Sequence, residues 1–151
     1  MALLRRAGLS VVTAESCTAG LISTVLSQAD GAGHCLHGSF VTYTKPHKVA
    51  ALGVSRELLA AKGSVHEDVA RQMAEGALHR STADIVLALT GVIGPEEDED
   101  GNPVGRVIFA CGRRQDVLNV VEENFDAAHH EILRRAVVLR GLDYIRKVAS
   151  G

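Results

Sequence analysis

The sequence is poor in the residue types on which several functional classes depend. Only 3% of its 151 residues are aromatic and none is tryptophan, so a surface that stacks on single-stranded nucleic acid has few residues to form it. The three cysteines, Cys17, Cys35 and Cys111, are an odd number and include no Cys-x-x-Cys pair, which argues against a disulfide framework and a structural zinc site. No apolar run is long enough to span a bilayer, and Arg5 and Arg6 are not followed by a signal-peptide core. We therefore expect a cytoplasmic protein that binds neither membranes nor nucleic acid.

The residues that are abundant are those of an ordinary globular core. Apolar residues make up 46% of the chain, which is enough for one compact domain of this length. The formal net charge is −2, so charge alone favours neither nucleic acid nor an anionic membrane as a partner. There is no internal repeat, linker or low-complexity tail, and we predict a single domain over residues 1–151.

Strand and helix patterns alternate along the chain. Strands are expected at 9–14, 38–43, 83–90, 107–111 and 117–121, the last two forming a hairpin around 112–115. Helices are expected at 2–7, 21–26, 66–80 and 129–148, with shorter ones beginning near Pro46 and Ser55. The last helix is expected to present one apolar side formed by Ile132, Leu133, Ala136, Leu139 and Ile145. This order predicts an α/β fold: a three-layer α/β/α sandwich with a mixed, mostly parallel sheet of about five strands.

A candidate nucleophile lies between the first strand and the following helix, in the segment Glu15-Ser16-Cys17-Thr18-Ala19-Gly20. Ser16 is expected near a helix N-terminus, where free backbone N–H groups and the helix dipole favour negative charge. The N–H groups of residues 17–20 are therefore candidate oxyanion donors. A serine at such a turn is more often a plain helix cap, and Cys17 beside it is expected to be a buried structural thiol.

A serine nucleophile needs a base, and the seven histidines show no obvious orienting partner. A lysine whose ammonium is desolvated can also act as the base, because burial lowers the pKa of the ammonium group. The segment from Tyr43 to Lys48 ends a predicted strand and holds two lysines, Lys45 and Lys48, at the edge of the sheet where α/β folds bind ligands. For an arbitrary lysine, a solvated surface charge is the commoner role.

Several linked motifs resemble one known family. They are Thr13-Ala14-Glu15-Ser16-Cys17-Thr18-Ala19-Gly20, Phe40-Val41-Thr42-Tyr43, Lys48, Leu52-Gly53-Val54, Ala74-Glu75-Gly76-Ala77, Thr90-Gly91-Val92-Ile93-Gly94-Pro95 and Pro103-Val104-Gly105. In this order they are similar to the C-terminal domain of the competence/damage-inducible protein CinA, also found alone as nicotinamide-nucleotide amidohydrolase. The resemblance covers nearly the whole chain.

The resemblance implies a hydrolase that converts nicotinamide mononucleotide to nicotinate mononucleotide and ammonia, with no metal and no cofactor. It implies Ser16 as nucleophile, Lys48 as base and the Tyr43 hydroxyl as a group that positions or relays the proton. Together with the expected position at the sheet edge, it gives a set of substrate-binding residues: Glu15, Cys17, Thr18, Ala19, Gly20, Thr90, Gly91 and Gly94. It also implies a homo-oligomer.

The chain departs from the family pattern at three places. Ala19 stands where the family usually has glycine, and Lys45 where it usually has asparagine. A run of carboxylates at 96–100 replaces a glycine-rich loop. If this run faced the site it would repel a nucleotide phosphate, and we favour the simpler reading of a solvated loop directed away from the site. Two alternatives stay open: a noncatalytic nucleotide- or partner-binding module that uses the acidic loop, and a related hydrolase for an amide without a phosphate.

Overall fold

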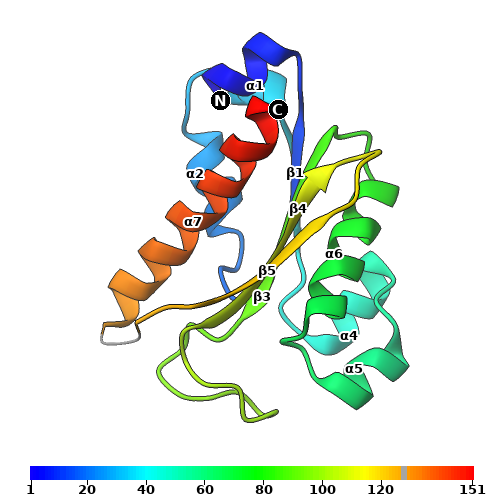
Figure 1. Cartoon of the computed structure of the whole chain (residues 1–151), viewed down its shortest axis with the longest axis vertical. Coiled ribbons are helices and arrows are strands. Elements are labelled where there is room, and N and C mark those ends of the chain that lie inside the picture. Colours follow the sequence, from blue (N-terminus) through cyan, green and yellow to red (C-terminus); the bar gives the residue numbers. More distant parts are fainter. Residues whose placement is uncertain (127–128) are drawn as a thin grey trace.

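The computed structural model describes residues 1–126 and 129–151 (Figure 1). In chain order the elements are α1 (Ala2–Ala7), β1 (Val11–Glu15), α2 (Leu21–Ser27), α3 (Ala32–Cys35), β2 (Leu36–Val41), α4 (Lys45–His47), η1 (Lys48–Leu52), α5 (Arg56–Lys62), α6 (Glu67–His79), β3 (Ile85–Gly91), β4 (Arg106–Arg113), β5 (Asn119–Asn124) and α7 (His130–Ser150). Here η1 is a single π-helical turn. Within the described ranges no helix is both long and apolar enough to cross a membrane.

The five strands form one mixed sheet in the order β2-β1-β3-β4-β5. β1 pairs in parallel with both β2 and β3, whereas β4 is antiparallel to β3 and to β5. Four of the five strands therefore point in one direction, and the predicted mixed, mostly parallel sheet is confirmed.

Helices cover both faces of this sheet, which confirms the predicted three layers (Figure 1). On one face, α1, α2 and α7 pack on alternate strand residues such as Val11, Leu87 and Phe109. On the other face, η1, α5 and α6 pack on the intervening residues, among them Val12 and Val86. The chain leaves β1 over the first face and returns to β3 over the second. A crevice thus opens between the carboxyl ends of β1 and β3, where sheets of this order bind ligands.

Along α7 the buried face differs from the predicted one. Ile132 and Leu139 are 64% and 56% exposed, so their expected place on the inner side is wrong. The buried face runs through Leu133, Val137, Gly141, Tyr144 and Ile145. Gly141 lies so close to α2 and β3 that a Cβ there would come within 2.8 Å of Ile22 Cδ1 and 3.0 Å of Leu87 Cδ2. Glycine does not contribute to a hydrophobic pattern, so the sequence does not reveal a buried helix face that includes a glycine.

The last two strands form the predicted hairpin with shifted ends. β4 extends to Arg113, and β5 begins at Asn119, two residues later than predicted. Val117 lies in the connection and is 91% exposed. The structure also has the short helix α3, for which the glycine-rich sequence around Gly31 gave no helical signal.

Candidate active site

The carboxyl ends of three parallel strands meet at one point of the sheet edge. Ser16 directly follows β1, and its N–H donates to the carbonyl of Leu89 in β3 at 3.2 Å. On the other side, the N–H of Thr42 donates to the carbonyl of Glu15 at 2.8 Å, which continues the pairing of β1 with β2. The peptide group that joins Glu15 to Ser16 is therefore hydrogen-bonded on both sides, which fixes the backbone at the predicted nucleophile.

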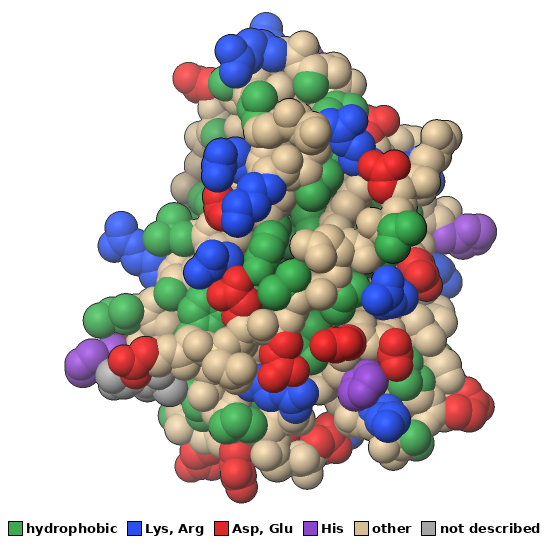
Figure 2. Space-filling model, viewed as in Figure 1, with side chains coloured by type: hydrophobic (Ala, Val, Ile, Leu, Met, Phe, Trp, Pro, Cys, Tyr) green, Lys and Arg blue, Asp and Glu red, His purple; other side chains and the backbone are tan. Residues whose placement is uncertain are grey.

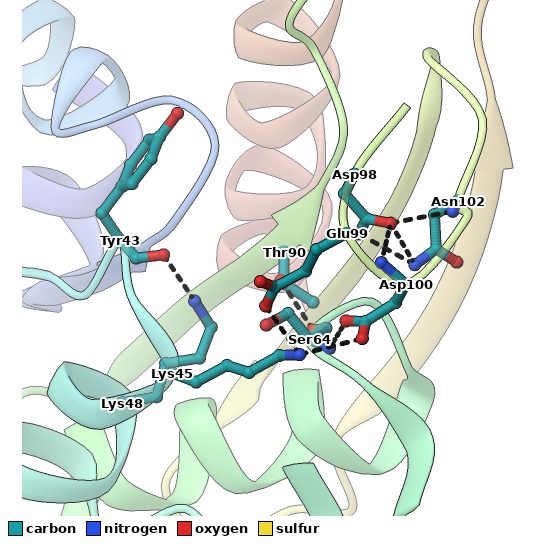
Figure 3. A network of polar contacts seen from close by, with 9 residues as sticks. All are labelled: Tyr43, Lys45, Lys48, Ser64, Thr90, Asp98, Glu99, Asp100 and Asn102. Carbon is teal, nitrogen blue, oxygen red and sulfur yellow. Dashed lines mark hydrogen bonds and ion pairs between the residues drawn. The ribbon is translucent and has the colours of Figure 1, made fainter. Parts of the chain in front are cut away.

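The Lys48 ammonium reaches this point from η1. Its Nζ lies 2.7 Å from Ser16 Oγ and donates to the carbonyl oxygen of Thr42 at 2.7 Å. It also contacts the carbonyl oxygen of Tyr43 at 3.4 Å (Figure 3). The residue is 0% exposed, and this burial lowers the pKa of Lys48 to about 8. Burial disfavours the charged form of an amine, so a useful fraction of Lys48 is neutral in mildly alkaline solution. A neutral Lys48 can keep its donation to Thr42 while it accepts the Ser16 hydroxyl proton.

Local sequence explains how a lysine comes to lie inside the protein. Thr44 caps the short helix α4 by accepting from the N–H of His47 at 3.3 Å, and Pro46 favours its first turn. The chain then widens into the π-turn η1, which ends where Gly53 adopts a left-handed conformation with φ 74°. Single π-turns of this kind often occur at functional sites.

Helix α6 packs closely against η1 and fixes its position. A Cβ on Gly76 would lie 2.0 Å from the carbonyl oxygen of Leu52, so only glycine permits this approach. The same carbonyl accepts from the guanidinium of Arg80 at 3.0 Å. The contact between α6 and η1 thus determines how deeply Lys48 is placed in the protein.

The Glu15 side chain holds in place the turn that contains Ser16. Its buried carboxylate accepts from the N–H groups of Ile22 and Ser23 at 3.0 and 2.8 Å, and so caps α2. It also accepts from the hydroxyls of Thr18 at 2.7 Å and Thr13 at 3.1 Å. The structure therefore places the Glu15 carboxylate and the Thr18 hydroxyl together beneath the turn, and the substrate contact predicted for these residues stays a prediction.

Ala19 and Gly20 complete the turn, and neither lines the cavity described below. Ala19 is exposed and has a φ of 51°, which makes it the one non-glycine residue of positive φ among the described residues. Its methyl group therefore strains the backbone without narrowing the site.

Replacing Ala19 with glycine should remove this strain. We expect Ala19→Gly to raise the free energy of unfolding by ~0.5–1 kcal/mol, because glycine adopts a positive φ without steric cost, although its unfolded state has more entropy to lose. Urea denaturation measures the change. An unchanged or lowered midpoint, with an unchanged slope, would contradict the assignment of strain to this residue.

Cys17 lies beside the nucleophile and lines the cavity. It is half-buried, and the burial of its thiol raises the pKa to about 12. A thiol in this state stays protonated at neutral pH, and only the thiolate is a strong nucleophile. Of the two adjacent candidates, Ser16 is the one with a base in contact.

The nucleophile opens into a cavity of about 580 Å³. It is lined by Ser16, Cys17, Tyr43, Thr44, Lys45, Pro46, Ser64, Val65, Thr90, Gly91, Val92, Ile93, Gly94, Glu96, Asp98, Glu99 and Asp100. Of the predicted substrate-binding residues, Cys17, Thr90, Gly91 and Gly94 are thus brought to the cavity. Thr90 contributes further by donating from its hydroxyl to the carbonyl of Ser64 at 2.9 Å.

Tyr43 brings its backbone to Lys48, but the structure does not bring its hydroxyl there. Its backbone carbonyl contacts Lys48, but its side chain is 65% exposed and its hydroxyl points away from the ammonium (Figure 3). In this structure the hydroxyl is therefore not the group that positions the base. The carbonyl oxygens of Thr42 and Tyr43 do so, and backbone atoms leave no signal in a sequence motif.

The acidic loop faces the cavity, and the expectation that it points away from the site is wrong. Four of its carboxylates line the cavity, those of Glu96, Asp98, Glu99 and Asp100. Lys45 meets them from the opposite rim, with its Nζ 2.7 Å from Glu99 and 2.9 Å from Asp100 (Figure 3). In the space-filling view, acidic side chains lie at the lower end of the molecule, where the loop joining β3 to β4 is found (Figure 2). Sequence reasoning assigned no role to Lys45, and its attraction to carboxylates 55 residues away pulls the loop inward.

Comparison with known proteins adds a family to this geometry. A sequence model described as the CinA C-terminal domain matches residues 1–149. A putative competence-damage inducible protein of Symbiobacterium thermophilum is 46% identical over 112 residues, covering 74% of this chain and 26% of that protein. A CinA-like protein of Geobacter sulfurreducens is 39% identical over 145 residues, covering 96% of this chain and 35% of that protein. The chain thus spans about a third or less of the length of these curated relatives.

Solved structures agree over almost the whole chain. The competence/damage inducible protein CihA from Agrobacterium tumefaciens superposes with a TM-score of 0.89 at 36% identity, over 97% of this chain and 93% of that one. A CinA superfamily protein from Escherichia coli gives a TM-score of 0.85 at 34% identity, over 94% and 83% of the two chains. Both the sheet and the helices that surround the site therefore belong to a shared architecture.

Proposed function

This chain belongs to the CinA C-terminal domain family, and we propose that it is a serine-lysine amidohydrolase acting on the carboxamide of an N-ribosylated nicotinamide. The substrate that the family resemblance implies is nicotinamide mononucleotide, with nicotinate mononucleotide and ammonia as products. The observation that carries the proposal is the 2.7 Å contact between the buried Lys48 amine and the Ser16 hydroxyl. A nucleophile within hydrogen-bonding distance of a base of lowered pKa is the arrangement that covalent hydrolysis requires.

The reaction follows from this pair. Ser16 Oγ attacks the carboxamide carbon while its proton passes to neutral Lys48 Nζ, and the carbonyl π electrons move to the oxygen. As the tetrahedral intermediate collapses, Lys48 returns the proton to the departing nitrogen, ammonia leaves and an acyl ester remains on Ser16. Water then attacks the ester with Lys48 again as base, which releases the carboxylate and restores the serine.

Negative charge on the carbonyl oxygen needs donors close to Ser16. Of the predicted donors at 17–20, the Ala19 N–H already donates to the Ser16 carbonyl at 3.0 Å, and Gly20 does not line the cavity. In this proposal the N–H groups of Cys17 and Thr18, in the turn that leads into α2, therefore supply the donors. Glu15 supports the arrangement, because its four accepted hydrogen bonds hold the turn and the first residues of α2 in one geometry. Donors that are already fixed need no reorganisation as charge develops.

The position and size of the cavity also support a small nucleoside-like substrate. It lies at the carboxyl ends of β1 and β3, and its volume of about 580 Å³ falls within the usual range for ligand pockets. Threonine, serine and glycine residues of β3 and the 63–65 turn provide polar atoms for the part of the ligand beyond the carboxamide.

Ammonia release from nicotinamide mononucleotide by the purified protein tests the proposal. Acid quenching during turnover, followed by mass spectrometry, should detect a nicotinoyl-type acyl group on the peptide that contains Ser16. A folded Ser16→Ala variant should lose both signals. Substrate binding by the wild type with no ammonia and no adduct would instead favour the noncatalytic binding module.

A further inference from the structure

We propose that the acidic loop makes this site selective for a phosphate-free, positively charged amide, the N-ribosyl nicotinamide itself, over its 5′-phosphate. This inference rests on the proposed function and names the substrate class of the same site. The selectivity would reside in the acidic wall, defined as Glu96, Asp98, Glu99 and Asp100, and chiefly in its last two residues.

The charged lining of the cavity is unbalanced. Its described residues include the four carboxylates of the acidic wall and a single cation, Lys45. That cation is already engaged, since its Nζ contacts both Glu99 and Asp100. These contacts, with Glu99 first, raise the pKa of Lys45, and the ammonium lowers the pKa of Asp100, so this ion pair stays charged at neutral pH. A phosphate entering the cavity finds no free counter-ion among these residues.

The acidic wall is also built into the loop and needs no ligand to form. Asp98 accepts from the N–H groups of Asp100 and Asn102 at 3.0 and 2.8 Å, which closes the loop upon itself. Asp100 accepts from the N–H of Ser64 at 3.1 Å, which ties the loop to the turn after α5. A Cβ on Gly63 would meet Asp100 Oδ2 at 2.5 Å, so that turn fits closely around the carboxylate. Turning the wall away from a phosphate would break these contacts.

Charge then separates two otherwise similar ligands. In an N-ribosyl nicotinamide the pyridinium ring carries one positive charge, and the 5′-phosphate adds up to two negative charges at the other end. Any orientation that places the carboxamide at Ser16 leaves the remainder of the ligand in a cavity whose net lining charge is negative. Attraction to the ring and repulsion of the phosphate both favour the nucleoside, and both weaken in water and salt.

The experiment compares kcat/KM for nicotinamide riboside and nicotinamide mononucleotide in the wild type and a Glu99→Gln/Asp100→Asn variant. We expect the wild type to prefer the riboside, and the double substitution to lower the riboside-to-nucleotide ratio by about tenfold, because it removes two charges and frees Lys45 for the phosphate. Glu99→Gln alone, which alters only an exposed contact with Lys45, should shift the ratio in the same direction. Glu97→Gln is the matched control: Glu97 is exposed in the same loop, does not line the cavity, and should leave the ratio unchanged.

Binding separates this inference from the proposed function. Calorimetric titration of a Ser16→Ala variant with each ligand gives the same comparison without turnover. Tighter binding of the riboside, with no turnover by the wild type, would refute the proposed amidohydrolase activity and support the charge selectivity. A wild type that prefers the nucleotide, with a ratio unmoved by Glu99→Gln/Asp100→Asn, would overturn the selectivity and keep the amidohydrolase.

Discussion

Replacing Lys48 with methionine is expected to lower kcat for ammonia release by about 10²- to 10⁴-fold, the usual contribution of a general acid–base group. The reason is that Lys48 is the one amine or imidazole among the described residues that is hydrogen-bonded to the Ser16 hydroxyl. In the wild type, kcat/KM should rise with pH and level off above an apparent pKa of about 8, because only neutral Lys48 accepts the serine proton. The residual activity of the variant should lack this rise.

The same substitution should not weaken the fold. A buried ammonium is costly, and methionine fills a similar volume without a charge. Against this gain stands the loss of the hydrogen bonds to the Ser16 hydroxyl and the Thr42 carbonyl, about 1 kcal/mol each. At pH 7 we expect Lys48→Met to leave the free energy of unfolding unchanged or to raise it by up to ~2 kcal/mol.

The pH dependence of stability gives a sharper signature. The pKa of Lys48 falls from 10.5 to about 8 on folding, so the unfolded chain binds more protons between these values. The wild type is therefore destabilised below pH 8, and it recovers about 3 kcal/mol relative to Lys48→Met as the pH rises from 8 to 10.5. Urea denaturation at a series of pH values measures the difference.

A surface lysine provides the control for these measurements. Lys62, exposed in the last turn of α5, should give a Lys62→Met variant with wild-type activity and no change in the pH dependence of stability. Should Lys48→Met retain the alkaline rise in activity, another group would be the base and the serine-lysine pair would be refuted.

Gly76→Ala is expected to cost ~2–3 kcal/mol of stability and to reduce kcat as well. In a helix interior alanine is intrinsically favoured over glycine by about 1 kcal/mol, so any loss must come from tertiary contact. That contact is with backbone, since the new Cβ would lie 2.0 Å from the Leu52 carbonyl oxygen. The Leu52 carbonyl can move away from the new Cβ only if η1 shifts. Because Lys48 belongs to η1, that shift would also move its ammonium away from Ser16.

Gly141→Ala is the comparison for this prediction. Its Cβ would also come close to neighbours, at 2.8 Å from Ile22 Cδ1, but this atom ends a side chain that can adopt another rotamer. We therefore expect a smaller loss of stability and an unchanged kcat. Thermal unfolding and ammonia release, measured on both variants, test the contrast. Equal effects of the two substitutions on kcat would show that η1 is not positioned by α6.

Local sequence patterns were sufficient for the layers of the fold. The apolar run at 83–90 indicated a strand, and β3 forms there with both of its faces covered. The helix predicted at 66–80 is observed as α6, and Val69, Met73 and Ala77, which lie four residues apart along it, are fully buried. Prediction failed on α7, where the buried stripe passes through Gly141.

The site was accessible to sequence reasoning only in part. Ser16 at a strand-to-helix turn was a weak signal alone, and it was the family resemblance that singled out Lys48 from Lys45. The orientation of the acidic loop depends on Lys45, Ser64 and Asp100, which come together only in the folded chain. The positioning carbonyls of Thr42 and Tyr43 are likewise a property of the backbone path. Homo-oligomer formation stays a prediction.

The π-turn at η1 sets limits on how this chain can vary in length. Such a turn holds one residue more than an α-helical turn, and each residue rotates the helix by about 100°. Lys48 at its beginning and Leu52 at its end are both held, one by Ser16 and the other by Arg80. Deletion of one residue between them would rotate Lys48 relative to Leu52, so that only one of the two residues could keep its contact. Length changes should therefore be poorly tolerated at residues 48–53.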